Sequence, residues 1–92
     1  MQITLVAMGQ LEKAFGGGRF DFEFSPGSTL ADLLEKIGND FSDRLPGSLW
    51  NRSARKFRGP VVLMSDGSAL RDPAEALRDG QEIRVFKVLV GG

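Results

Sequence analysis

The chain lacks the side chains on which much enzyme chemistry depends. Its 92 residues include no cysteine, no histidine and no tyrosine. The first two absences exclude disulfide bonds, metal sites built from thiolates or imidazoles, a cysteine nucleophile and a histidine general base. The composition therefore favours a function other than catalysis by the chain itself.

Long apolar runs and an excess of one charge are also missing. Twelve Lys and Arg residues balance twelve Asp and Glu residues, so the bulk charge does not predict a nucleic acid partner. No apolar stretch approaches the roughly 20 residues of a membrane span, and the beginning of the chain lacks the pattern of a signal peptide. We therefore expect one globular domain over residues 1–92, located in the cytoplasm, without nucleic acid or membrane partners.

Apolar residues alternate in two short runs in the first third of the chain. Residues 2–8 are rich in β-branched side chains and predict a strand with Ile3 and Leu5 on its buried face. Three glycines then precede residues 20–24, where phenylalanines alternate with acidic residues and predict a second strand. Two strands around a glycine turn predict a hairpin. A phosphate-binding loop is disfavoured, because neither Lys-Ser/Thr nor a helix pattern follows the glycines.

The segment after these strands carries the clearest helix signal. Its apolar residues recur at i, i+3, i+4 and i+7, as Leu30, Leu33, Leu34 and Ile37. Ser28 or Thr29 can cap the amino end, and Gly38 is typical of a helix end. We predict a helix over residues 29–38 whose apolar stripe covers the buried faces of the two strands.

Residues 39–60 show no sustained periodicity and predict a long, partly helical connection, with a helical turn after Pro46-Gly47. The segment is locally basic, with no acidic residue between its first and last cation: Arg44, Arg52, Arg55, Lys56 and Arg58. These cations indicate either a docking surface for an acidic or phosphorylated partner or an ordinary solvated loop.

The last third of the chain predicts three more β segments. "PVVLMS" indicates a buried strand, "DGS" a tight turn and "ALRDP" a short edge piece, while "QEIRVFKVLV" indicates a long final strand. Val85 and Phe86 are neighbours in that strand and point to opposite faces, so one of them must belong to the core. Two glycines, Gly91 and Gly92, follow the strand.

Three features taken together resemble the ubiquitin-like sulfur carriers of the MoaD/ThiS group, which includes the molybdopterin synthase small subunit. "STLADLLEKIG" is similar to the helix of that family, "ALRDGQEIRVF" to its approach to the last strand, and the Gly-Gly pair to its carboxyl end. The resemblance covers residues 1–38 and 61–92. It implies an α+β fold, the β-grasp, in which a mixed sheet of four or five strands wraps one main helix. The first and last strands are then adjacent and parallel at the sheet centre.

The resemblance also implies a function. An adenylating enzyme of the ubiquitin-activating type would use ATP to activate the carboxylate of Gly92, and a sulfur donor would convert it to a thiocarboxylate. A larger synthase subunit would then receive the tail during synthesis of a molybdenum or tungsten pterin cofactor. The chain would be a carrier and not an enzyme, would bind no cofactor of its own, and would be a monomer when free.

The same resemblance assigns the site residues. Phe86 and Leu70 match apolar positions that contact the adenylating partner. The tail that enters the partner comprises Val88, Leu89 and Val90, followed by Gly91 and the reactive Gly92. A tail without Cβ atoms at its end fits a narrow channel, and we expect it to be flexible. One departure from the family is Lys87-Val88, where the molybdopterin synthase subunit commonly has two prolines.

Two other functions are compatible with the same residues. The chain could be a protein modifier that is joined through Gly92 to lysines of target proteins. It could also be a β-grasp interaction domain whose terminal glycines have no chemical role. The products formed with an adenylating enzyme and ATP distinguish the three.

Overall fold

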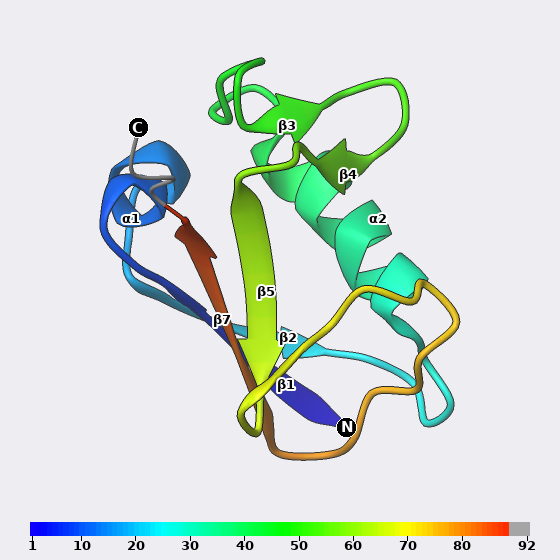
Figure 1. The fold of residues 1–92 in the computed structure, drawn as a ribbon. Coiled ribbons are helices and arrows are strands. Elements are labelled where there is room, and N and C mark those ends of the chain that lie inside the picture. Colours follow the sequence, from blue (N-terminus) through cyan, green and yellow to red (C-terminus); the bar gives the residue numbers. More distant parts are fainter. Residues whose placement is uncertain (89–92) are drawn as a thin grey trace.

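The computed structural model describes residues 1–88 as a mixed sheet with one long helix against it (Figure 1). The elements in chain order are β1 (Gln2–Ala7), α1 (Gln10–Phe15), β2 (Arg19–Glu23), α2 (Leu30–Phe41), β3 (Trp50–Asn51), β4 (Lys56–Phe57), β5 (Val61–Ser65), β6 (Ser68–Ala69) and β7 (Gln81–Lys87). Five strands form the main sheet in the order β2-β1-β7-β5-β6, and β3 pairs with β4 in a separate hairpin. No helix in residues 1–88 is long and apolar enough to cross a bilayer.

The two strands that are farthest apart in sequence lie side by side at the sheet centre. β1 and β7 are parallel, with Ile3 opposite Gln81 and Ala7 opposite Val85. β2 pairs antiparallel with the other edge of β1, and β5 pairs antiparallel with β7. This is the predicted arrangement of the first and last strands, and it confirms the α+β class.

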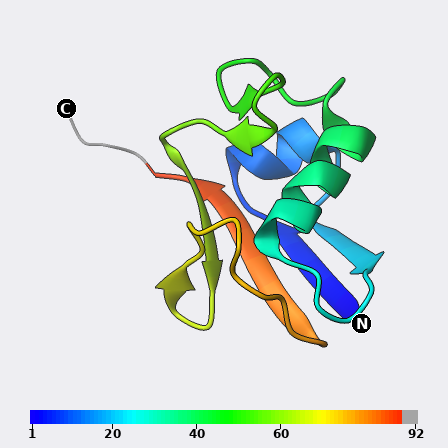
Figure 2. The ribbon, with the colours of Figure 1, turned by 90° about the vertical axis from the view of Figure 1, so that its right-hand side faces the viewer.

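The core lies between α2 and one face of the sheet (Figure 2). Leu33 and Ile37 of α2 are fully buried, as are Leu5, Ile83 and Val85 of the central strands. Burying one such side chain contributes about 1.5–3 kcal/mol. The burial of Leu33 and Ile37 confirms that the predicted apolar stripe of α2 faces the sheet.

The chain between β1 and β2 differs from the predicted glycine hairpin. The two strands are antiparallel as expected, but the six-residue helix α1 stands between them. Leu11 and Phe15 of α1 are fully buried, and the Phe15 ring centroid lies 4.8 Å from that of Phe41. The first glycine, Gly16, donates its N–H to the carbonyls of the last turn of α1. The glycines therefore end a helix and do not form the predicted hairpin turn. A helix of this length is not stable alone, and the burial of its two apolar residues stabilises it.

The predicted end of the main helix at Gly38 is also wrong. α2 continues to Phe41, and Gly38 is buried within it. A Cβ at Gly38 would lie 3.0 Å from Nη1 of Arg55 and 3.4 Å from Cζ2 of Trp50. The missing side chain therefore allows the β3–β4 hairpin to approach α2 closely.

The basic connection is more ordered than the sequence predicted. The turn after Pro46 is present, since the amides of Leu49 and Trp50 donate to its carbonyl over 3.0 and 3.1 Å. The hairpin that follows packs Trp50 against Phe57, with ring centroids 4.8 Å apart. The indole of Trp50 fills the space beside Gly38.

Replacing Gly9 with alanine is expected to lower the free energy of unfolding by about 1–3 kcal/mol. Gly9 joins β1 to α1 with φ 57° and ψ −123°, a conformation that an L side chain rarely adopts. A Cβ there would meet no atom within 4 Å, so the cost arises from the backbone alone. Gly47→Ala is the control, because Gly47 has open space and no positive φ. Urea titration should show Gly47→Ala unchanged or stabilised by up to about 1 kcal/mol; equal losses in both variants would contradict the argument.

Candidate functional site

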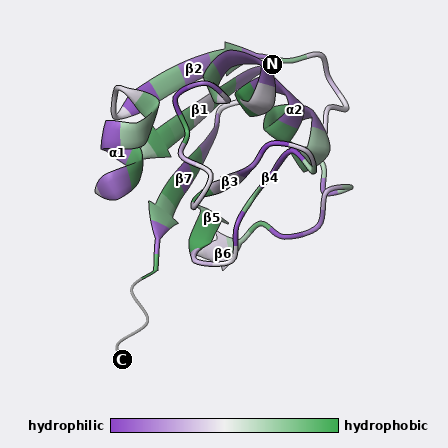
Figure 3. Cartoon of the chain, turned by 90° about the horizontal axis from the view of Figure 1, so that it is seen from above, coloured by the Kyte–Doolittle hydropathy of each residue, from purple (hydrophilic) through white to green (hydrophobic). Residues whose placement is uncertain are grey.

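The sheet face that α2 leaves uncovered carries apolar side chains from three neighbouring strands. Both hydrophobic and hydrophilic residues occur along β7 (Figure 3). Ile83 and Val85 are buried, so Glu82, Arg84 and Phe86, which alternate with them, face outward. The register places Val62 opposite Phe86, and both Met64 and Val6 opposite Arg84. We call the apolar members of this face the outer-face patch: Val6, Met8, Val62, Met64 and Phe86.

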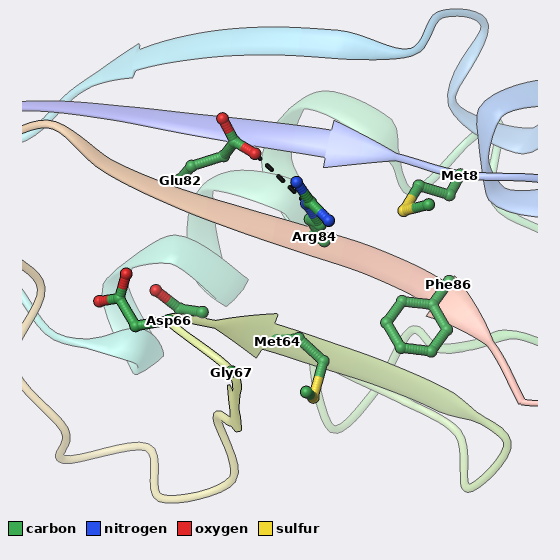
Figure 4. A pocket seen from close by; sticks show the side chains of 8 residues that line it. Met8, Met64, Asp66, Gly67, Glu82, Arg84 and Phe86 are labelled. Atoms are coloured by element: carbon green, nitrogen blue, oxygen red, sulfur yellow. Dashed lines mark hydrogen bonds and ion pairs between the residues drawn. The ribbon is translucent and has the colours of Figure 1, made fainter.

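The outer-face patch is accessible and is bordered by charges. Met8 is 42% exposed, and the other four side chains are half-buried. A shallow groove of about 560 Å³ crosses the patch between Met8, Met64 and Phe86 (Figure 4). Arg84 lies in the same groove and pairs with Glu82 over 3.3 Å. Aromatic residues, methionine and arginine are enriched at protein interfaces, and this groove contains all three.

The structure decides which residue of the Val85–Phe86 pair belongs to the core. Val85 is fully buried, whereas Phe86 is half-buried on the outer face. Val88 follows β7, is 42% exposed, and donates its N–H to the carbonyl of Pro60 over 2.7 Å. The predicted tail residues Leu89, Val90, Gly91 and Gly92 lie outside the described residues.

Leu70 and Phe86 are not brought together. Leu70 follows β6, packs against the core, and donates its N–H to the carbonyl of Leu63 over 2.8 Å. It lines grooves other than the one that contains Phe86. Whether Leu70 contacts a partner therefore stays a prediction separate from that for Phe86.

Four members of the outer-face patch were not singled out from the sequence. Val6 belongs to β1 and Met8 follows it, whereas Val62 and Met64 belong to β5. These residues are close to one another only because of the order of strands in the sheet. The available signal was the alternation within each strand, which places Val6 on the face opposite Leu5.

Most of the predicted basic cluster is engaged within the protein. Arg52 pairs with Asp43 over 2.6 Å, and Arg58 donates to the carbonyl of Gly47 over 2.5 Å. Arg55 donates to the side chain of Asn39 over 2.8 Å and pairs with Glu35 over 3.2 Å, which ties the hairpin to α2. Arg44 lies over the ring of Phe41, with its guanidinium carbon 5.9 Å from the centroid.

The outer face carries exposed charged groups beside the groove. Within residues 1–88, no three acidic side chains come together in a geometry that could hold a metal ion. Asp66, at the edge of the same groove, forms an ion pair with Arg78. Arg84 and Glu82 are both exposed, so each can exchange its partner for a charge on another protein.

Solved structures share this architecture, although no protein-family model and no curated protein matches the sequence. SAMP1, a small archaeal modifier protein from Haloferax volcanii, superposes with a TM-score of 0.80 and 16% identity over 100% of both chains. The putative molybdopterin converting factor subunit 1 from Pyrococcus furiosus gives 0.73 and 17% identity over 97% of this chain and 99% of that one. A chain from the complex of molybdopterin-converting factor subunits 1 and 2 from Helicobacter pylori gives 0.62 and 13% identity over 100% of both.

The agreement covers the whole sheet and the main helix. At identities this low, the likeness establishes the fold. Its parallel central strands and its one long helix against a mixed sheet are the features that the sequence resemblance led us to expect. The chain therefore has the ubiquitin-like β-grasp fold seen in small archaeal modifier proteins and molybdopterin converting factor subunits.

Proposed function

We propose that this protein is a sulfur carrier whose terminal carboxylate is adenylated by a partner enzyme and then converted to a thiocarboxylate. The observation that carries the proposal is the position of Phe86. It lies in the outer-face patch on β7, the strand that leads through Val88 to Gly91 and Gly92. A partner that binds the patch would therefore hold the body close to the origin of the tail. The fold, shared with molybdopterin converting factor subunits, supports the same conclusion.

The chemistry requires a partner because a carboxylate is a poor electrophile. In the proposed reaction the carboxylate oxygen of Gly92 attacks the α-phosphorus of ATP, and pyrophosphate leaves. A sulfur nucleophile at the oxidation level of sulfide then attacks the acyl carbon, and AMP leaves with the bonding electrons. The adenylating enzyme binds the ATP. The carrier supplies the acyl group, its docking surface and an extended tail whose five residues from Val88 to Gly92 reach about 16–18 Å.

Two partners are proposed for the outer-face patch. The first is an adenylating enzyme of the ubiquitin-activating type, and the second is a larger synthase subunit that receives the charged tail in synthesis of a molybdenum or tungsten pterin cofactor. The H. pylori complex, in which subunit 1 is bound to subunit 2, supports the second. The exposed charges of Arg84 and Glu82 would set the orientation and the rate of encounter. We propose that the free carrier is a cytoplasmic monomer without a bound cofactor and without catalytic activity of its own.

Intact-mass spectrometry tests the proposal. The protein is incubated with the adenylating enzyme of its own organism, ATP, Mg²⁺ and sulfide, and a second sample omits ATP. Exchange of one oxygen for one sulfur at the terminal carboxylate, only with ATP, is the expected result. An unchanged mass with a demonstrably active enzyme would favour the interaction domain.

The modifier is the second candidate because SAMP1, a small archaeal modifier protein, shares the fold at a TM-score of 0.80. In that case the acyl group of Gly92 would pass to a lysine amine of a target protein. The two functions use the same adenylate and differ in the nucleophile that attacks it. Because the last tryptic site of the chain follows Lys87, tryptic peptides that carry a Val-Leu-Val-Gly-Gly remnant on lysine would identify the modifier.

Replacing Phe86 with serine is expected to weaken binding of the adenylating enzyme at least about tenfold, or about 1.4 kcal/mol. Large aromatic side chains at the centre of an interface commonly contribute more than their neighbours. Leu34→Ser is the control, because Leu34 is also half-buried but lies on α2, on the opposite side of the sheet. Calorimetric titration should show weaker binding for Phe86→Ser than for Leu34→Ser. Equal losses of affinity would argue against binding through the outer face. Leu70→Ser, measured alongside, tests its predicted contact.

A further inference from the structure

A second groove lies on the helix side of the sheet, between α2 and β5. Its volume is about 420 Å³, within the range of about 300–1,000 Å³ that is typical of ligand pockets. Half-buried apolar side chains line it: Leu34, Phe57, Val61 and Leu70. β4 bounds the groove at one end, and the segment after β6 bounds it at the other.

One wall of this groove is a strand edge that is only partly paired. β5 pairs with β7 from Val61 to Met64, but β6 faces only Met64 and Ser65. The carbonyl of Leu63 accepts the N–H of Leu70 on the β6 side. In an antiparallel strand the N–H and C=O of one residue point the same way, so the N–H of Leu63 and the C=O of Val61 also face this edge. An extended peptide could therefore add a short strand here.

The charged side chains that line the groove are of one sign. Lys56 and Arg71 are its charged lining residues, and neither is paired with a carboxylate among the ion pairs of residues 1–88. The neighbouring Asp72 accepts the N–H of Ala74 over 2.9 Å within its own turn. Arg52 and Arg55, by contrast, are held by Asp43 and Glu35. Both ends of the groove therefore present a cation that has no internal partner.

We propose that this groove binds an extended acidic peptide of a partner protein as an added strand on β5. The peptide backbone pairs with Val61 and Leu63, and its aliphatic side chains lie against Leu34 and Leu70. Its acidic residues on either side of the aliphatic ones pair with Lys56 and Arg71. The site uses neither Phe86 nor the terminal glycines, although Val62 of the outer-face patch borders it and Leu70 is also a predicted contact of the adenylating enzyme. Peptide binding can therefore be tested without the sulfur-carrier reaction.

The test is a nuclear magnetic resonance titration of the full-length protein with a synthetic peptide of three valines flanked on each side by two glutamates, capped at both ends. Saturable amide shifts are expected at Val61, Leu63 and Leu70, with at least tenfold slower hydrogen exchange of the Leu63 amide. A peptide with lysines in place of the glutamates should bind at least tenfold more weakly.

Charge reversal provides the matched control. Lys56→Glu combined with Arg71→Glu should lower the affinity at least tenfold, whereas Lys13→Glu combined with Arg19→Glu, which changes the net charge equally at exposed positions, should not. Both double variants should keep the dispersed amide spectrum of the folded protein. Shifts centred on Phe86, no saturable shift, or the same shifts on raising the protein concentration without peptide would each overturn the proposal.

Discussion

Removal of Gly92 is expected to abolish thiocarboxylate formation and to change the free energy of unfolding by no more than about 0.5 kcal/mol. The deletion moves the reactive carboxylate back by about 3.3–3.6 Å along an extended tail. In the proposed complex the docked body could not follow, because the outer-face patch would fix its position on the partner. Intact-mass spectrometry of the reaction measures the product, and urea titration measures stability. Normal conversion of the shortened chain would refute the sulfur-carrier proposal.

Gly91→Val is the companion variant, because it keeps the length of the tail and adds a branched side chain. If a narrow channel admits only backbone, this variant should bind the adenylating enzyme as tightly as the natural chain but fail to react. The docking energy would then come from the body around Phe86 and not from the tail. An equal loss of binding and conversion would instead show that the tail supplies much of the affinity.

Leu33→Ala is expected to lower the free energy of unfolding by about 2–5 kcal/mol. Leu33 is fully buried between α2 and the sheet, so the truncation leaves a cavity that the neighbouring strands cannot close. The loss is large against the total stability of about 5–15 kcal/mol that is typical of a natural domain.

The adjacent leucine provides the control for this prediction. Leu34 is half-buried, so Leu34→Ala removes less buried surface and leaves no closed cavity. Urea titration of both variants should therefore show the greater loss for Leu33→Ala. The opposite order would mean that α2 presents a different stripe to the sheet.

Strong local patterns predicted most of the architecture. Each of three patterns indicates one buried face: the alternation around Phe22, the alternation around Val85, and the helical spacing from Leu30 to Ile37. The structure confirms all three. The parallel pairing of β1 with β7 was available only through the resemblance, because local periodicity carries no information on which strands are neighbours.

The missed features depend on contacts between distant segments. Gly38 is typical of a helix end in sequence, yet it lies within α2 because Trp50 and Arg55 pack against it. The helix α1 has six residues, too few for a clear period, and its stability comes from the burial of Leu11 and Phe15. In both cases tertiary packing outweighs local preference.

The candidate site could be predicted only in part, because it too depends on contacts between distant segments. Phe86 was identified through the resemblance, and the alternation with Val85 required one of the two to face outward. The sequence of the strand alone does not show which of the two residues belongs to the core, because both are apolar. Met64 and Met8 join Phe86 only after the sheet has assembled.

The parallel contact between β1 and β7 also determines when this protein can fold. Ile3 meets Gln81, so the central ladder closes a loop of almost the entire chain, and such non-local pairing folds slowly. During synthesis the sheet cannot be completed until β7 has left the ribosome. A nascent or truncated copy without β7 would lack both the core strand and Phe86, and would have no docking face to offer. Under the proposed function, folding would thus act as quality control, since only a completed copy could engage a partner.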